Sequence, residues 1–146
     1  MLSVVEKVIF LQNVDVFSEV PTEQLAYLAA IAEELRCSSG ERLYEEDEPS
    51  DCMYLVLEGE VRLHRDDISI TVARRKEAFG TWALFDDEPR LGAATCTEET
   101  RLLRVDREDF IEVLADNVQI TRGVLKAIAR RLRALGRVVR PPPGPS

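Results

Sequence analysis

The stretch Phe79 to Ala94 reads F-G-T-W-A-L-F-D-D-E-P-R-L-G-A-A and decides the fold of this chain. Upstream of it, Gly40 to Glu46 reads G-E-R-L-Y-E-E, and Met53 to Leu63 reads M-Y-L-V-L-E-G-E-V-R-L. Downstream, Thr100 to Arg107 reads T-R-L-L-R-V-D-R and is followed by Phe110. These flanking blocks alternate apolar and polar residues, which is typical of short β-strands on either side of the glycine- and arginine-bearing stretch.

The central stretch resembles the phosphate-binding cassette of cyclic nucleotide-binding domains. This is the family of the bacterial catabolite activator protein, protein kinase A regulatory subunits and gated cation channels. Its cassette pattern is F-G-E-x-A-L followed downstream by R-x-A, and its strands read G-x-x-L-x-x-E and Y-x-V-x-x-G-x-V. The flanking blocks occur in the family order, and the resemblance covers roughly residues 5–138.

The resemblance implies a ligand site built around the start of a short helix. In this family the first N–H groups of that helix have no intrahelical acceptor and point at the cyclic phosphate. Gly80 would let the backbone approach the ligand closely, and Arg90 would form a charge-assisted pair with the phosphate. The residues expected to line the phosphate side are Phe79, Gly80, Thr81, Trp82, Ala83, Leu84, Arg90, Gly92 and Ala93.

The chain departs from the family pattern at the expected ligand site. Thr81 replaces the glutamate that accepts a hydrogen bond from the ribose 2′-hydroxyl, Lys76 replaces a glycine, and Gly92 replaces the alanine of R-x-A. Losing such a hydrogen bond to a charged group costs about 1.5–3 kcal/mol. A buried arginine also needs a partner, which a phosphate or the acidic run 86–88 could provide.

Two hypotheses for function therefore stand side by side. The first is a regulatory sensor module that binds cAMP or cGMP, with full, weakened or lost affinity. The second is a ligand-free protein-interaction or dimerisation module that keeps the fold within a larger protein. In the family mechanism, phosphate capture shifts a hinge near Phe110, and the last helix swings over the pocket.

Hydrophobic periodicity predicts helices at both ends of the chain and strands between them. Residues 4–11 and 22–35 have helical spacing, 40–105 alternate with turn residues between short runs, and helices return at 107–115 and from 118. With the resemblance, this predicts an α+β, mainly β fold: an eight-stranded antiparallel, jelly-roll-like β-roll, or double-stranded β-helix, flanked by N- and C-terminal helices. We expect one domain over residues 1–140 and a proline-rich tail over 141–146.

The last predicted helix carries an apolar seam and a strong positive charge. Leu125, Ile128, Leu132 and Leu135 repeat at helical spacing, which favours a homodimer or a protein partner packed on this seam. Residues 118–140 contain seven basic side chains and no acid, while the rest holds 12 basic and 27 acidic side chains, a net −15. Such a helix is most simply a solvated basic face, and the alternatives are that it binds its own acidic body, a partner, an acidic membrane surface or nucleic acid.

Composition argues against an enzyme. His64 is the only histidine and is predicted to be a surface side chain, so neither a metal-dependent cupin site nor a histidine-based triad can be assembled. We expect no metal, no cofactor and no catalysis. Trp82, the only tryptophan, is predicted to pack under the cassette helix, with stacking on a ligand as the alternative.

The remaining features concern the cell compartment and larger context. Three cysteines lie far apart, which favours reduced thiols and an intracellular protein. No apolar run approaches the roughly 18 residues of a membrane span, so we expect a cytoplasmic protein or a cytoplasmic domain. No DNA-binding domain is expected after the final prolines. The opening residues resemble copies of this domain appended to larger bacterial chains, including membrane-associated ones.

Overall fold

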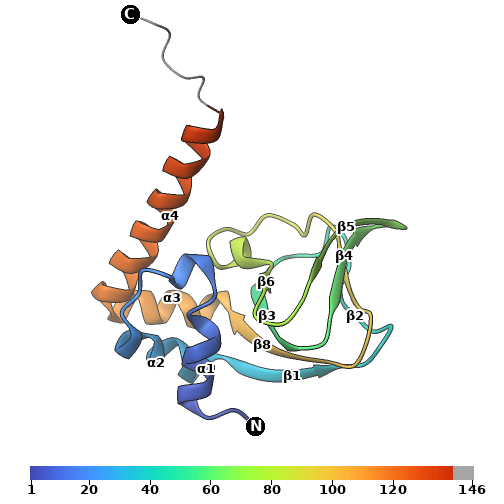
Figure 1. The fold of residues 1–146 in the computed structure, drawn as a ribbon, viewed down its shortest axis with the longest axis horizontal. Helices are drawn as coiled ribbons and strands as arrows, with labels where there is room; N and C mark the ends of the chain where they lie inside the picture. The colour runs from blue at the N-terminus through green and yellow to red at the C-terminus, as the bar shows by residue number, and fades with distance from the viewer. Residues whose placement is uncertain (140–146) are drawn as a thin grey trace, which may run out of the picture.

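The computed structural model describes residues 1–139, with the helices gathered on one side of a β-roll (Figure 1). The elements are α1 (Val4–Leu11), η1 (Asp15–Phe17), α2 (Thr22–Ile31), β1 (Glu33–Cys37), β2 (Arg42–Tyr44), β3 (Cys52–Glu58), β4 (Val61–Arg65), β5 (Ile68–Ala73), β6 (Ala78–Phe79), η2 (Thr81–Leu84), β7 (Ala93–Cys96), β8 (Thr100–Asp106), α3 (Arg107–Asp116) and α4 (Val118–Val139). The predicted fold class is confirmed. The predicted tail, 141–146, lies outside the described residues.

The strands form two four-stranded antiparallel sheets, in the orders β1-β8-β3-β6 and β2-β7-β4-β5. Strand β3 is central to the packing because it is buried on both faces. Tyr54 and Val56 point into the interior of the roll, whereas Met53, Leu55 and Leu57 join the core beneath the helices. Side chains alternate between the two faces of this strand, but both faces are buried and apolar because each covers a separate core, so the apolar–polar alternation predicted for this block does not hold here.

The predicted helix over 22–35 is wrong at its C-terminal end. Helix α2 ends at Ile31, Ala32 is extended (φ −86°, ψ 123°), and Leu35 lies on β1 opposite Leu102. Five residues of β1 pair in register with β8. Sheet pairing satisfies the backbone groups of this segment, and this long-range contact outweighs the local helical spacing.

Helix α4 packs its N-terminal half on the body, with Ile120, Val124 and Ala127 buried. Gly123 makes the close approach feasible, because a Cβ there would lie 2.8 Å from the carbonyl oxygen of Glu19. The C-terminal half extends away from the other elements (Figure 1). No helix within residues 1–139 is both long and apolar enough to span a membrane.

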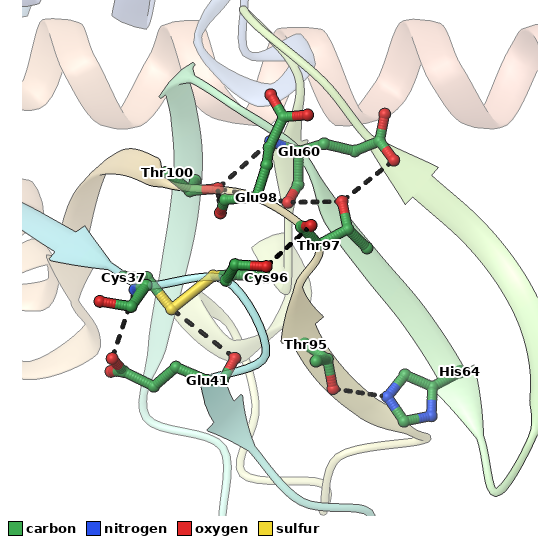
Figure 2. Close-up of a disulfide and its surroundings, with 11 residues drawn as sticks. Cys37, Glu41, Glu60, His64, Thr95, Cys96, Thr97, Glu98 and Thr100 are labelled. Carbon is green, nitrogen blue, oxygen red and sulfur yellow. Dashed lines mark hydrogen bonds between the residues drawn. A yellow bond between two sulfur atoms is a disulfide. The ribbon is translucent and has the colours of Figure 1, made fainter.

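The expectation of three reduced cysteines is wrong. Cys37, at the end of β1, and Cys96, at the end of β7, form a disulfide that joins the two sheets (Figure 2). Their Cα atoms lie 6.4 Å apart, and both side chains are buried. Folding brings these two strand ends together although they are 59 residues apart in sequence. Cys52 alone is a free thiol, and it is buried.

The prediction of a surface His64 is also wrong. His64 is 3% exposed, and its ring lies 2.7 Å from the Thr95 hydroxyl (Figure 2). The other ring nitrogen lies 2.8 Å from the Asp66 carbonyl oxygen. The pairing of β4 with β5 shifts register between Leu63 and His64. A bulge of this kind re-aims a side chain, so the alternation read from the sequence does not hold at this residue.

Candidate functional site

A pocket of about 640 Å³ opens between η2, the segment that follows it and the second sheet. This volume lies within the range of about 300–1,000 Å³ typical of small-molecule sites. The pocket brings together six of the nine predicted residues: Gly80, Trp82, Ala83, Arg90, Gly92 and Ala93. The other lining residues are Tyr44, Asp47, Leu63, Arg65, Ile70, Asp86, Glu88, Pro89 and Leu91.

Three predicted site residues lie elsewhere. Phe79 is buried and stacks on Tyr54, with ring centroids 5.3 Å apart, so it supports the site from the roll interior. Leu84 belongs to the core beneath the helices. Thr81 lines a second cavity of about 440 Å³, between the cassette and residues 13–16, rather than the main pocket.

Arg90 is the most unusual side chain of the pocket. It is 6% exposed, and its Nη2 donates to the carbonyl oxygen of Cys52 at 2.8 Å. Its Nε is buried without a hydrogen-bond partner, and it forms no ion pair with any carboxylate within residues 1–139. A buried charge normally has a counter-ion, so this guanidinium is available to an anion in the pocket.

Gly80 connects Arg90 to the start of η2. Its backbone is left-handed (φ 70°, ψ 18°), and a Cβ there would lie 2.6 Å from Nη1 of Arg90. Only glycine can adopt this left-handed backbone conformation and also leave room for the Arg90 side chain without strain. Because Ala83 N–H already donates to the Gly80 carbonyl at 3.1 Å, the earlier amides of Thr81 and Trp82 have no acceptor inside the helix.

Gly92 is also required by close packing. A Cβ at this position would lie 2.7 Å from the backbone oxygen of His64 and 3.2 Å from Cδ1 of Ile70. The alanine of the family pattern therefore cannot be accommodated here unless β4 shifts. The departure from R-x-A reflects how tightly this strand packs at the edge of the pocket.

The segment after η2 is held in place by hydrogen bonds from the first residue of α3 and from Ser50, which precedes β3. Nη1 of Arg107 donates to three carbonyl oxygens, those of Ser50 (2.7 Å), Asp86 (2.6 Å) and Ala83 (3.2 Å). The Ser50 hydroxyl donates to the Glu88 carbonyl at 2.5 Å. The pocket wall is thereby tied to the first turn of α3.

The pocket combines a buried cation with carboxylates at its rim. Asp47, Asp86 and Glu88 are exposed lining residues, and none of them neutralises Arg90. The predicted alternative, in which the acidic run 86–88 pairs with Arg90, is therefore wrong: that segment is anchored through its backbone instead. Burial raises the pKa of the Tyr44 phenol, so the phenol stays neutral in the pocket at physiological pH.

Trp82 does not pack under the cassette as predicted. Its side chain is 48% exposed, and the guanidinium of Arg131 lies 5.3 Å from its ring centroid. It lines both the main pocket and the second cavity. Arg131 in turn lies 3.5 Å from Asp15, and Arg130 lies 2.9 Å from Glu19. Part of the basic surface of α4 is thus paired with its own body.

Tyr44 is a pocket residue that sequence reasoning missed. Its ring lies under the Arg90 guanidinium, 4.1 Å from the charged carbon to the ring centroid. The block Gly40 to Glu46 contains this tyrosine, and an aromatic residue at a strand end is a weak signal of such a role. No sequence pattern pairs it with an arginine on a distant segment.

Comparison with known proteins gives the family. The model of the cyclic nucleotide-binding domain matches residues 34–117, more than half of the chain. This chain belongs to the cyclic nucleotide-binding domain family. The matched range contains the whole β-roll after the first residue of β1, the cassette and α3, which agrees with the resemblance found in the sequence.

Relatives within this family are regulatory proteins. The chain is 28% identical over 128 residues to a CRP-like cAMP-activated global transcriptional regulator of Mycobacterium tuberculosis, covering 84% of this chain and 57% of the regulator. It is 29% identical over 115 residues to a cAMP-dependent protein kinase regulatory subunit of Aspergillus fumigatus, covering 77% of this chain and 28% of the subunit. The chain thus spans at most about 57% of the length of these relatives.

A solved structure gives the same result. The N-terminal domain of a transcriptional regulator from Streptomyces coelicolor A3(2) is 31% identical, with a TM-score of 0.80. The match covers 90% of this chain and 96% of that domain. The chain therefore belongs to the cyclic nucleotide-binding domain family in sequence and has its fold.

Proposed function

We propose that this chain is a sensor module that binds cAMP or cGMP in the pocket beside Arg90. The observation that carries the proposal is the Arg90 guanidinium, which is buried, has an unpartnered Nε and has no carboxylate partner within residues 1–139. A cyclic phosphate would supply the missing anion and accept hydrogen bonds from the free amide N–H groups at the start of η2. Gly80, Ala83, Gly92 and Ala93 would line the phosphate, and Trp82 would border it.

Thr81 sets the expected affinity. A threonine hydroxyl is shorter than the family glutamate, and Thr81 lies on the side of η2 that faces the second cavity. We therefore expect binding without the ribose contact, which corresponds to a loss of about ten- to a hundredfold in affinity. Substituting Thr81→Glu should restore part of this loss if the side chain reaches the ribose.

Isothermal titration calorimetry with cAMP and with cGMP tests the proposal. We expect saturable binding of at least one nucleotide, and no binding after Arg90→Ala. Arg62→Ala is a matched control, because Arg62 pairs with the Asp67 carbonyl on the β4–β5 hairpin and does not line the pocket. Absence of heat with either nucleotide at millimolar concentration would reject the sensor function.

A second function rests on a separate observation. Leu125, Leu132 and Leu135 are 61%, 64% and 55% exposed on α4, whereas Ile128 packs against the core. This stripe supports an interaction module that forms a homodimer or binds a protein partner, with or without nucleotide. Leu132→Asp tests it, since a chain that is equally monomeric with and without this change would reject the homodimer.

The proposed cellular location and parent protein are compatible with either function. We propose a cytoplasmic module within a regulatory protein, in which α4 passes the state of the pocket to whatever follows or contacts it. A membrane-associated parent protein is a further proposal that rests on the sequence resemblance. Light scattering of the chain with and without cAMP would show whether ligand and assembly are coupled.

A further inference from the structure

Tyr44 and Arg90 form a cation–π contact inside the pocket. The charged carbon of Arg90 lies 4.1 Å from the Tyr44 ring centroid, which is within the range of a strong cation–π contact. A guanidinium has five N–H donors in its plane, and packing a ring against its face uses none of them. The contact therefore holds the cation without consuming its hydrogen-bonding capacity.

The Tyr44 ring is itself held rigidly. It lies 6.3 Å from the Tyr54 ring and 6.4 Å from the Phe79 ring, and these two rings stack at 5.3 Å. Tyr44 also pairs with Ala94 across β2 and β7, close in sequence to Arg90. A ring fixed by two aromatic neighbours and a strand pairing is a well-defined platform for a flexible side chain.

A carboxylate in the place of this ring would act differently. It would form a bidentate pair with Arg90 and occupy the N–H groups that a ligand anion needs. The anion would then have to displace an ion pair before it could bind. The aromatic platform avoids this competition, and the Cys52 carbonyl takes only one end of the guanidinium.

We propose that Tyr44 is the positioning residue for Arg90: its ring stacks under the guanidinium and keeps it in the pocket with its donors free for a phosphate. This inference rests on the proposed function, because the anion it serves is the cyclic phosphate. It assigns a binding role to a residue outside the cassette. The neutral phenol suits this role, since a phenolate would pair with the cation.

The position of Arg90 can be measured without any ligand. In ¹⁵N-labelled chain, the Nε–Hε resonance of Arg90, assigned by its loss in Arg90→Lys, should be shifted upfield by the Tyr44 ring. We expect Tyr44→Leu to move this resonance toward those of the other arginines. Tyr44→Phe keeps the ring and should leave the resonance close to its original position, and Tyr27→Leu is the control for removing an exposed tyrosine.

The same variants are titrated with cAMP. We expect Tyr44→Leu to weaken binding about tenfold, the equivalent of a partly desolvated cation–π contact. Tyr44→Phe should stay within about twofold of the original affinity. A resonance that does not move in Tyr44→Leu overturns the proposal, and so does a moved resonance with unchanged affinity.

Two further results separate the possible failures. If the unmodified chain does not bind cAMP or cGMP at all, the proposed function fails, while the resonance still decides whether the Tyr44 ring lies against the Arg90 guanidinium. If Tyr44→Leu does not fold by circular dichroism, a nuclear Overhauser effect between Arg90 Hε and the Tyr44 ring protons in the unmodified chain decides instead. Its presence supports the stacked geometry, and its absence overturns it.

Discussion

The guanidinium of Arg131 lies over the indole of Trp82, 5.3 Å from the ring centroid, and so links the middle of α4 directly to the cassette. Arg131 also lies 3.5 Å from Asp15 in η1. One side chain of α4 thus contacts both the pocket wall and the N-terminal helices. A ligand that moves Trp82 would change the environment of α4 at this point.

Breaking this contact should loosen α4. We expect Arg131→Gln to shift Trp82 fluorescence and to speed amide hydrogen exchange in α4, because an exposed cation–π contact contributes about 0.5–1 kcal/mol. Trp82 is the only tryptophan, so the emission reports on this site alone. Arg133→Gln, an exposed change on the same helix, is the control. Equal shifts in both variants would contradict a specific contact.

A methyl group at Gly80 should disturb the pocket. Gly80→Ala places a side chain in a left-handed conformation at a cost of about 1–2 kcal/mol, and its Cβ meets Nη1 of Arg90 at 2.6 Å. We expect lower stability by urea denaturation and weaker nucleotide binding. Gly136→Ala is the control, because a Cβ at Gly136 would meet no atom within 4 Å. It should leave the free energy of unfolding unchanged or raise it by up to about 1 kcal/mol. Unchanged binding in Gly80→Ala would argue against this geometry.

Removing the Arg107 side chain should release the segment that follows η2. Arg107→Ala leaves the carbonyls of Ser50, Ala83 and Asp86 without this donor. We expect a loss of about 1.5–3 kcal/mol in the free energy of unfolding, with faster hydrogen exchange over residues 83–88. Arg36→Ala on the exposed face of β1 is the control. Slow exchange of that segment in Arg107→Ala would show that it is held by other contacts.

The disulfide makes a stoichiometric prediction. With Cys37 and Cys96 paired, chain unfolded without reductant should show one reactive thiol, that of Cys52. Reduction should lower the free energy of unfolding by about 4 kcal/mol, as expected from closing a loop of this length. The double variant Cys37→Ser/Cys96→Ser should be insensitive to reductant. Three reactive thiols in unreduced chain would exclude the pairing.

The sequence was sufficient for the cassette because its residues lie close together along the chain, and for the roll because the blocks that form its strands occur in the family order. Gly80, Ala83 and Arg90 carry a local pattern, and all three line one pocket. The errors lie where distant segments meet. Leu35 is helical by spacing, but β8 recruits it into a sheet, and His64 turns inward at a register shift.

Other misses have the same physical origin. The Cys37–Cys96 pair and the Tyr44–Arg90 stack join residues on separate strands, and single-sequence periodicity holds no information on such contacts. Trp82 is predicted to pack under the cassette helix because the family usually has an aliphatic residue at this position, yet it lies half exposed, lines two cavities and contacts a cationic side chain of α4. Size and hydropathy alone do not fix which neighbour covers a residue.

The length of α4 makes it a mechanical lever. Its 22 residues rise about 1.5 Å each, so the helix is about 33 Å long, and among residues 118–136 its buried side chains all lie in the first half. A rotation of about 10° at its root would carry its tip through about 6 Å, from the same helical dimensions. A small rotation of α4 near Gly123, which leaves the core packed, would therefore displace the far end of the helix by several ångströms.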